Sequence, residues 1–206
     1  PGLGAMAFHE GRSFMAGKLG QPVLGANITL WDDALAPNTI PVPFDCEGVP
    51  KRRLELITGG VARGVCYDSY TAGKEGKRST GHALPPGWGE GSLPTHLFLQ
   101  PGTATPEEMV ASVRRGLLIT RFHYTRTLHP LTVTITGMTR DGTFLIENGE
   151  IARPVRNLRF TQSYVEALNQ VEAIGRETRL ESTLFAFNRV PALRIARWNF
   201  TSATEY

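Results

Sequence analysis

Glycine and proline interrupt this chain at short intervals, 22 and 14 times respectively in 206 residues. Glycine supplies the positive φ of tight turns, and proline ends helices and central strands, so few segments are long enough for a helix of many turns. Alternating polar and apolar residues occupy segments between these breaks, as at 27–31 and 131–136. This pattern predicts many short strands joined by turns.

Pairs of turn-forming residues divide the predicted strands into hairpins. Gly59-Gly60 separates the apolar segments 54–58 and 61–66. Asp141-Gly142 and Asn148-Gly149 are the two strongest hairpin signals, because Asn or Asp followed by Gly tolerates the positive φ of a type I′ turn. We therefore expect a hairpin at each of the three pairs. Further strands are predicted over 97–100, 143–147, 151–160 and 193–200.

Two helices are predicted from their capping residues. The first begins at a capping box formed by Thr105 and Glu108, and Gly116 ends it. The second begins at a box formed by Ser163 and Glu166, and Gly175 ends it. Its apolar face consists of residues at helical spacing, namely Tyr164, Leu168, Val171 and Ile174.

These elements amount to eight or nine strands and two or three helices, joined by hairpins rather than crossovers. They predict an α+β fold on a large, mainly antiparallel β-sheet of hairpins or a meander, with a barrel-like closure as an alternative. No linker rich in proline and serine divides the chain, so residues 1–206 are expected to form one domain. The polar, glycine-rich stretch 72–95 is expected to be either disordered or functional.

Composition excludes several classes of protein. No apolar run approaches the roughly 20 residues of a membrane-spanning helix, and no signal segment opens the sequence. Cys46 and Cys66 are too few for a disulfide scaffold or a cysteine-based zinc site, so a reduced cytoplasmic compartment is expected. The net charge is only +3, and the 18 arginines are scattered, which favours solvated faces and ion pairs over a nucleic-acid surface.

No motif in the sequence completes an active site. His9-Glu10 begins like the zinc-protease motif H-E-x-x-H, but Ser13 stands where the second histidine is needed on the same helix face. His123 and His129 lie six residues apart and could meet, although loop histidines are usually only solvated. The nucleophile motif G-x-S-x-G is absent. From motifs alone, we assign no catalytic residue and no metal ligand to this chain.

Eight short blocks, in order over nearly all of residues 11–200, resemble the TldD/PmbA protein family. The blocks are Ser13-Phe14 with Gly17-Lys18 and Gly20; Ile28-Thr29-Leu30 with Asp32-Asp33; Phe44-Asp45 with Glu47-Gly48-Val49-Pro50; Leu56-Ile57 with Gly60; Ser79-Thr80-Gly81-His82-Ala83; Leu99-Gln100-Pro101-Gly102; Thr105-Pro106-Glu107-Glu108 with Gly116-Leu117; and the segment Phe144-Leu145-Ile146-Glu147-Asn148-Gly149-Glu150-Ile151 with Pro154-Val155, followed by Ile174-Gly175. Each block is weak alone, but their shared order is specific.

This resemblance implies the C-terminal half of a two-domain protein. The resemblance also implies a dimer, because family members form dimers of cytoplasmic zinc peptidases that act on unfolded or flexible peptides. Older names call them modulators of DNA gyrase. The TldD-like subunit carries an H-E-x-x-x-H zinc motif before the Ser-x-x-x-Gly block and a cysteine ligand near its C-terminus. The PmbA-like, or TldE-like, subunit lacks these residues and pairs with the catalytic subunit.

The residues of this chain match the non-catalytic pattern. The second zinc histidine of the family should fall near Pro1, which cannot ligate, and the first histidine and the glutamate would lie upstream. The expected cysteine is missing between Gly175 and Pro191, and Cys46 stands where the family usually has an acid. Residues 1–5 could also be an expression remnant, with Met6 as the start.

Three functions therefore remain open. The favoured one is a non-catalytic TldE-like domain that dimerises with a zinc-bearing TldD-like subunit, or with itself, and helps to form the peptide channel. Peptide would bind by strand addition to a sheet edge, with Ser79, Thr80, Gly81 and His82 as the rim. The alternatives are half of an active zinc peptidase with its ligands upstream, or a basic module that binds nucleic acid or gyrase.

Overall fold

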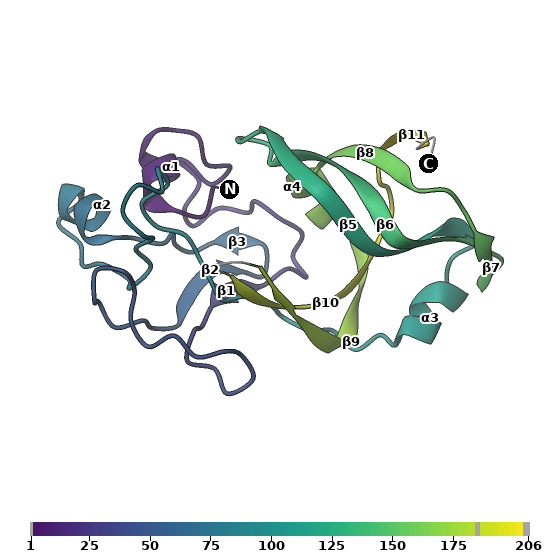
Figure 1. Cartoon of the computed structure of the whole chain (residues 1–206), viewed down its shortest axis with the longest axis horizontal. Helices are drawn as coiled ribbons and strands as arrows, with labels where there is room; N and C mark the ends of the chain where they lie inside the picture. Colours follow the sequence, from purple (N-terminus) through teal and green to yellow (C-terminus); the bar gives the residue numbers. More distant parts are fainter. Residues whose placement is uncertain (1, 184–185, 204–206) are drawn as a thin grey trace. The chain divides into compact units, whose positions relative to one another are not determined.

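The structure, a computed structural model, describes residues 2–183 and 186–203. The chain divides into two compact units (Figure 1). Unit 1 comprises residues 1–101 and 178–191, and unit 2 comprises residues 102–177 and 192–206. The helices are short: α1 (Ala5–His9), α2 (Ser69–Lys74), α3 (Pro106–Ala111) and α4 (Tyr164–Leu168). The strands are β1 (Leu30–Asp32), β2 (Leu54–Thr58), β3 (Val61–Ala62), β4 (Leu97–Leu99), β5 (Arg115–His129), β6 (Thr134–Glu147), β7 (Glu150–Pro154), β8 (Leu158–Ser163), β9 (Val171–Ser182), β10 (Phe187–Ile195) and β11 (Phe200–Ala203).

Unit 1 is built on short strands connected by long loops. Its strands belong to a sheet of order β3-β2-β1-β4-β10-β9, in which only the β4–β10 pairing is described as parallel. The aligned pairs in this sheet include Leu30 with Ile57 and Leu30 with Leu99, and all three side chains are buried. The short strands leave most backbone polar groups of unit 1 to be satisfied by loop contacts.

Unit 2 is dominated by one long hairpin of β5 and β6, which Figure 1 draws as two extended neighbouring ribbons. Its sheet has the order β11-β8-β6-β5, and β7 pairs with the end of β6. Phe160 on β8 is fully buried, and its ring contacts those of Phe122 and Trp198 at centroid distances of 4.6 and 5.4 Å. An apolar, aromatic core therefore lies against this antiparallel sheet.

The expected α+β class with a mainly antiparallel sheet is confirmed, although the strands form two sheets rather than one. The hairpin at Gly59-Gly60 joins β2 to β3 as predicted. The capping box at Thr105 is also confirmed: its side chain accepts from the Glu108 N–H, and the Glu108 side chain accepts from the Thr105 N–H. The helix ends at Ala111, however, before the predicted Gly116.

The predicted hairpin at Asp141-Gly142 is wrong. Both residues lie inside β6, where Asp141 has φ 64° and Gly142 has φ 154°, and the register between β5 and β6 shifts opposite them. The left-handed residue thus serves a β-bulge in a continuous strand, which uses the same conformations as a turn. The turn of this hairpin lies instead at 130–133, so β6 begins at Thr134 rather than at residue 131. Asn148-Gly149 does form the predicted turn, between β6 and β7.

The second predicted helix is too long. Ser163 caps α4 as expected, because its hydroxyl accepts from the Glu166 N–H at 3.2 Å, but α4 ends at Leu168. Val171 and Ile174 belong to β9, in which Val171 is buried and the next residue, Glu172, is exposed. The three-residue spacing of Val171 and Ile174 fits the helical repeat, but these residues do not form a helix. Likewise 151–160 contains two strands, β7 and β8, and 193–200 contains the end of β10 and the start of β11.

The first residues of the chain are integrated into unit 1. The Ala5 N–H donates to the Cys66 carbonyl at 2.8 Å, and the Cys66 N–H donates to the Leu3 carbonyl at 2.9 Å. Ala5 is fully buried.

Within the described residues, no helix has both the length and the apolar character needed to cross a membrane.

Candidate functional site

The segment Ser79, Thr80, Gly81 and His82, the predicted peptide rim, lies on a loop after α2. Thr80 fixes this loop to the strand-like segment at Tyr67. The Tyr67 N–H donates to the Thr80 hydroxyl oxygen at 2.8 Å, and the Thr80 N–H donates to the Tyr67 carbonyl at 3.1 Å. Ser79 reaches the same carbonyl with its own hydroxyl at 3.1 Å. The loop is therefore held in one place through both backbone and side-chain contacts.

Gly81 has no alternative at its position in this loop. Its φ is +77°, a left-handed backbone conformation that residues other than glycine rarely adopt. A Cβ atom would in addition stand 2.5 Å from the Pro50 carbonyl oxygen. The close approach explains why a glycine separates Thr80 from His82.

His82 is buried and bonded at both ring nitrogens. Its Nε2 lies 3.0 Å from Oδ1 of Asp32, and its Nδ1 lies 2.9 Å from the Thr80 hydroxyl. Both side chains of the Asp32–His82 pair are fully buried. Since an ionised carboxylate only accepts hydrogen bonds, Nε2 carries a hydrogen. The ring thus links the Asp32 carboxylate on one side to the Thr80 hydroxyl on the other. His82 therefore positions the loop from within rather than presenting its ring at a surface.

Several groups keep Asp32 ionised in this interior. Burial raises the pKa of Asp32, but the His82 hydrogen bond, the His82 and Lys51 charges and the His96 N–H outweigh it, so the pKa lies below its ordinary value. The His96 N–H donates to Oδ2 at 2.7 Å. Both carboxylate oxygens are thus satisfied, as a buried charge requires.

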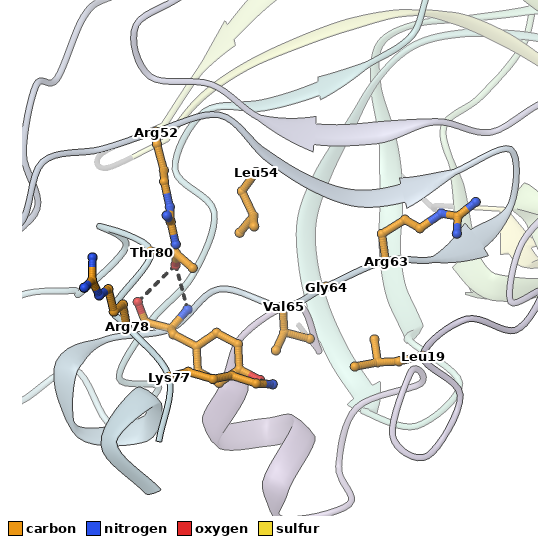
Figure 2. A pocket seen from close by; sticks show the side chains of 10 residues that line it. Leu19, Arg52, Leu54, Arg63, Gly64, Val65, Lys77, Arg78 and Thr80 are labelled. Atoms are coloured by element: carbon orange, nitrogen blue, oxygen red, sulfur yellow. Dashed lines mark hydrogen bonds between the residues drawn. The ribbon is translucent and has the colours of Figure 1, made fainter. Parts of the chain in front are cut away.

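A shallow pocket opens beside Thr80 (Figure 2). Its volume is about 330 Å³. We call it the basic pocket, because four of its ten lining residues are basic and none is acidic. The lining consists of Leu19, Arg52, Leu54, Arg63, Gly64, Val65, Tyr67, Lys77, Arg78 and Thr80. Of the predicted rim residues, Thr80 alone belongs to it.

One side of the basic pocket carries a cluster of ionisable groups. The Lys77 ammonium donates to the Tyr67 hydroxyl at 2.9 Å and to the Glu75 carboxylate, which the His9 ring also contacts. The Lys77 hydrogen bond, partly opposed by burial and assisted by His9 and Tyr67, lowers the pKa of Glu75 to about 2. Burial, only partly offset by Lys77, raises the pKa of Tyr67. At neutral pH the cluster therefore holds Lys77 and Glu75 as a neutralised ion pair.

The described residues do not fit a zinc site. Zinc in proteins takes three or four ligands from histidine, cysteine and carboxylates, and no group of three such side chains that could hold a metal ion lies together in residues 2–183 and 186–203. His9 and Glu75 share their contact with a lysine, and His82 is occupied within the fold. Burial, followed by the effect of Asp32, raises the pKa of the Cys66 thiol well above its ordinary value.

The structure brings together residues that the sequence blocks kept apart. Asp32 and His82 came from different blocks, and nothing in their spacing of 50 residues indicated contact. Arg52, Tyr67 and Arg78 were not singled out at all. No local pattern marks such residues, because loops rather than regular elements position them. His123 and His129, considered as partners, both lie on β5.

A family model and several known proteins match this chain. The model of the PmbA/TldA metallopeptidase C-terminal domain matches residues 1–202. A protein of Methanothermobacter thermautotrophicus named a metalloprotease is 27% identical over 83% of this chain and 37% of its own length. The metalloprotease PmbA of Escherichia coli O157:H7 is 26% identical over 84% of this chain and 36% of its own length. A TldD homologue of Haemophilus influenzae is 25% identical over 82% and 35%, respectively.

Solved structures share the fold. TldE from Thermococcus kodakarensis superposes with a TM-score of 0.84 at 23% identity, covering 97% of this chain and 45% of that one. A Thermotoga maritima protein, named as a candidate modulator of a DNA gyrase, has a TM-score of 0.85 at 24% identity, with 98% and 45% covered. The chain thus spans little more than a third of the curated relatives it matches.

Proposed function

The chain belongs to the family of PmbA/TldA metallopeptidase C-terminal domains, and we propose that it is a non-catalytic, TldE-like member. In this role it pairs with a zinc-bearing TldD-like subunit, or with a second copy of itself, and forms part of the wall of a peptide channel. The observation that carries the proposal is the match to the family model over residues 1–202, together with the structural likeness to TldE from Thermococcus kodakarensis. The zinc of the complex would be held by the partner subunit.

Names of relatives support both sides of this pairing. Relatives of this chain include proteins named TldD homologues, one of them a zinc metalloprotease of Saccharolobus solfataricus, and a structural neighbour is named TldE. The described residues of this chain lack a fitting set of zinc ligands. Free thiols at Cys46 and Cys66 suit the cytoplasm, where we place the complex.

Strand addition at β2 is the proposed mode of peptide binding. β3 pairs only with Ile57 and Thr58 of β2, and the Arg63 N–H then closes on the Leu56 carbonyl at 2.8 Å. Among the described strands, Leu54 pairs only with β1, and Leu54 is one of the residues that line the basic pocket. An extended peptide that pairs there would run past Thr80 and read backbone rather than sequence.

Subunit pairing and metal content test the main proposal together. The chain is mixed with the H-E-x-x-x-H-bearing family member of the same genome, and the mass of the complex is measured by size exclusion with light scattering. Metal is measured by mass spectrometry after zinc exposure and extensive dialysis. We expect a defined complex, with about one zinc per TldD-like chain and none retained by this chain alone. Stoichiometric zinc on this chain alone would instead support the active-peptidase alternative.

Modified peptides test strand addition without altering the protein. An unstructured fluorescent peptide is compared, by anisotropy, with versions N-methylated at alternate residues in either register. One register should lose at least about tenfold in affinity, because each lost backbone hydrogen bond costs about 1 kcal/mol, and the other should not. Equal binding of both versions would exclude pairing to β2. A stronger affinity for an oligonucleotide, falling steeply with salt, would favour the nucleic-acid alternative.

A further inference from the structure

We propose that the basic pocket binds a carboxylate of the peptide, an inference that rests on the peptide-binding role proposed above. Its occupant would be a peptide segment in which a carboxylate adjoins an apolar side chain. Two sources share this chemistry: the C-terminal carboxylate of a peptide, and an acidic side chain within it.

Unpaired guanidinium groups provide the attraction. Lys77 is neutralised by Glu75, whereas no described acidic side chain forms an ion pair with Arg52, Arg63 or Arg78. All three arginines are exposed, so they remain available to a ligand. Planar guanidinium groups suit a carboxylate, because two parallel N–H donors match its two oxygens.

Two of the three unpaired arginines lie together in the basic pocket, apart from the third. Figure 2 shows Arg52 and Arg78 on the side of Thr80, whereas the guanidinium group of Arg63 points away from them. The apolar lining consists of Leu19, Leu54 and Val65. A carboxylate near Arg52 and Arg78 would thus place an adjoining apolar side chain against this wall.

The position of β2 makes the two contacts compatible with a paired peptide. Arg52 lies two residues before Leu54, the first residue of β2, and both line the basic pocket. A peptide that pairs at Leu54 and directs its carboxylate toward residue 52 would bring that carboxylate into the region of Arg52. Strand addition and carboxylate recognition then use the same stretch of chain.

Size and ring contacts argue against a nucleic acid in this pocket. About 330 Å³ is at the small end of ligand sites and suits one or two residues of a peptide. The Lys77 ammonium lies 4.9 Å from the centre of the Tyr67 ring and covers one of its faces. A base would need a free aromatic face for stacking.

Four forms of one peptide test the inference by fluorescence anisotropy with the full chain. The first ends in leucine with a free carboxylate, and the second is its C-terminal amide. The third is an amide with glutamate beside the leucine, and the fourth carries glutamine in its place. We expect at least one carboxylate form to bind about ten times more tightly than its uncharged counterpart, and this preference to shrink as salt rises. The first pair reports a terminal carboxylate, and the second pair reports a side chain.

Charge-removing variants assign the effect to the pocket. Arg52→Gln and Arg78→Gln should each reduce the preference for the carboxylate form over the amide by about threefold to tenfold. Arg153→Gln is the matched control, since it removes the same charge from an exposed position of β7. Circular dichroism and urea unfolding confirm that all variants fold alike.

The outcomes separate this inference from the proposed function. Equal binding of all four peptides would overturn carboxylate recognition while leaving strand addition intact. Failure of every peptide to bind would overturn both. A preference that Arg153→Gln reduces as much as Arg52→Gln would assign it to overall charge, and tighter binding of an oligonucleotide that displaces the peptide would also overturn the inference.

Discussion

The two units bury different kinds of side chain. The interior of unit 1 contains Asp32, His82 and His96, each at most 1% exposed, among its apolar residues. Unit 2 buries Phe160 beneath a cluster of half-buried rings, with Phe122 stacked on Trp198 at 4.9 Å and Tyr164 against Trp198 at 5.7 Å. Unit 2 also buries hydrogen-bonded polar side chains, such as Thr139 and Thr143, but these are uncharged, whereas the buried polar groups of unit 1 include a carboxylate.

This difference follows from the strands available in each unit. The 15-residue β5 and the 14-residue β6 fix their register through a long ladder, so they need no buried charge to define their arrangement. β1, β2 and β4 have five residues or fewer, and long loops connect them. A buried carboxylate bonded to a histidine contributes little net stability, but it defines one arrangement, because the alternatives leave the Asp32 charge unpaired. Unit 1 uses such a pair to fix the loop at Thr80.

Removal of one partner of the Asp32–His82 pair should have the largest effect. Asp32→Ala leaves His82 and the His96 N–H without their acceptor, and we expect the free energy of unfolding to fall by about 3–5 kcal/mol. Urea unfolding followed by tryptophan fluorescence measures this loss. Asp33→Ala is the matched control, because Asp33 is half-buried and, among the described residues, its side chain accepts only from the Leu35 N–H, at 3.1 Å. Equal losses in both variants would show that the buried pair does not distinguish unit 1.

A change of shape in the aromatic core of unit 2 should be tolerated better. Phe160→Leu keeps an apolar side chain but loses the ring contacts with Phe122 and Trp198, and we expect a loss of about 1.5 kcal/mol. Differential scanning calorimetry of this variant beside Asp32→Ala compares the two interiors directly. A larger loss for Phe160→Leu would reverse the comparison between the units.

Sequence reasoning succeeded where neighbouring residues decide the structure. The Thr105 capping box and the Gly59-Gly60 hairpin are such features, since both depend on residues within a few positions of one another. It failed where a local signal had two structural uses. Asp141-Gly142 has the backbone conformations of a hairpin turn but forms a bulge in β6. The pairing with β5 decides between the two, and the residues around 141 do not indicate that pairing.

The candidate site was predictable only in part. The segment 79–82 was identified from the family resemblance, and Thr80 lines the basic pocket. The partner of His82 was not identified, because Asp32 ends β1, 50 positions away, and a loop brings His82 to it. Arg52 and Arg78 also gave no signal, since exposed arginines are common and only the fold places these two around one pocket. Whether segment 79–82 binds peptide remains a prediction.

The Thr105 cap should show how much a local feature of unit 2 contributes. Thr105→Ala removes the oxygen that accepts from the Glu108 N–H at 3.1 Å, and we expect a loss of about 1 kcal/mol. Thr103→Ala, an exposed change two residues earlier, should stay within about 0.5 kcal/mol of the parent. Urea midpoints at constant m-value measure both. If the two variants lose equal stability, the cap adds nothing beyond helix propensity.

Substitution of the exposed Glu75 should have the smallest effect on stability, although the pKa values of Glu75 and Asp32 are both lowered. The Lys77 hydrogen bond, partly opposed by burial, holds the pKa of Glu75 at about 2 instead of 4.5. A lowered folded pKa stabilises the protein above 4.5, and this stabilisation is lost as the pH falls toward 2. Because the cluster is exposed to solvent, we expect only about 0.5 kcal/mol.

The difference between Glu75→Gln and the parent should therefore be small at pH 7 and vanish near pH 2. Glu150→Gln, an exposed change on β7 with no ion pair among the described residues, should show no such pH dependence. By contrast, the deficit of Asp32→Ala should stay larger throughout the range above the ordinary carboxyl pKa of 3.8, because both members of that pair are buried. If Glu75→Gln lowered the free energy of unfolding as much as Asp32→Ala, burial of the charged group would not determine how much it stabilises unit 1.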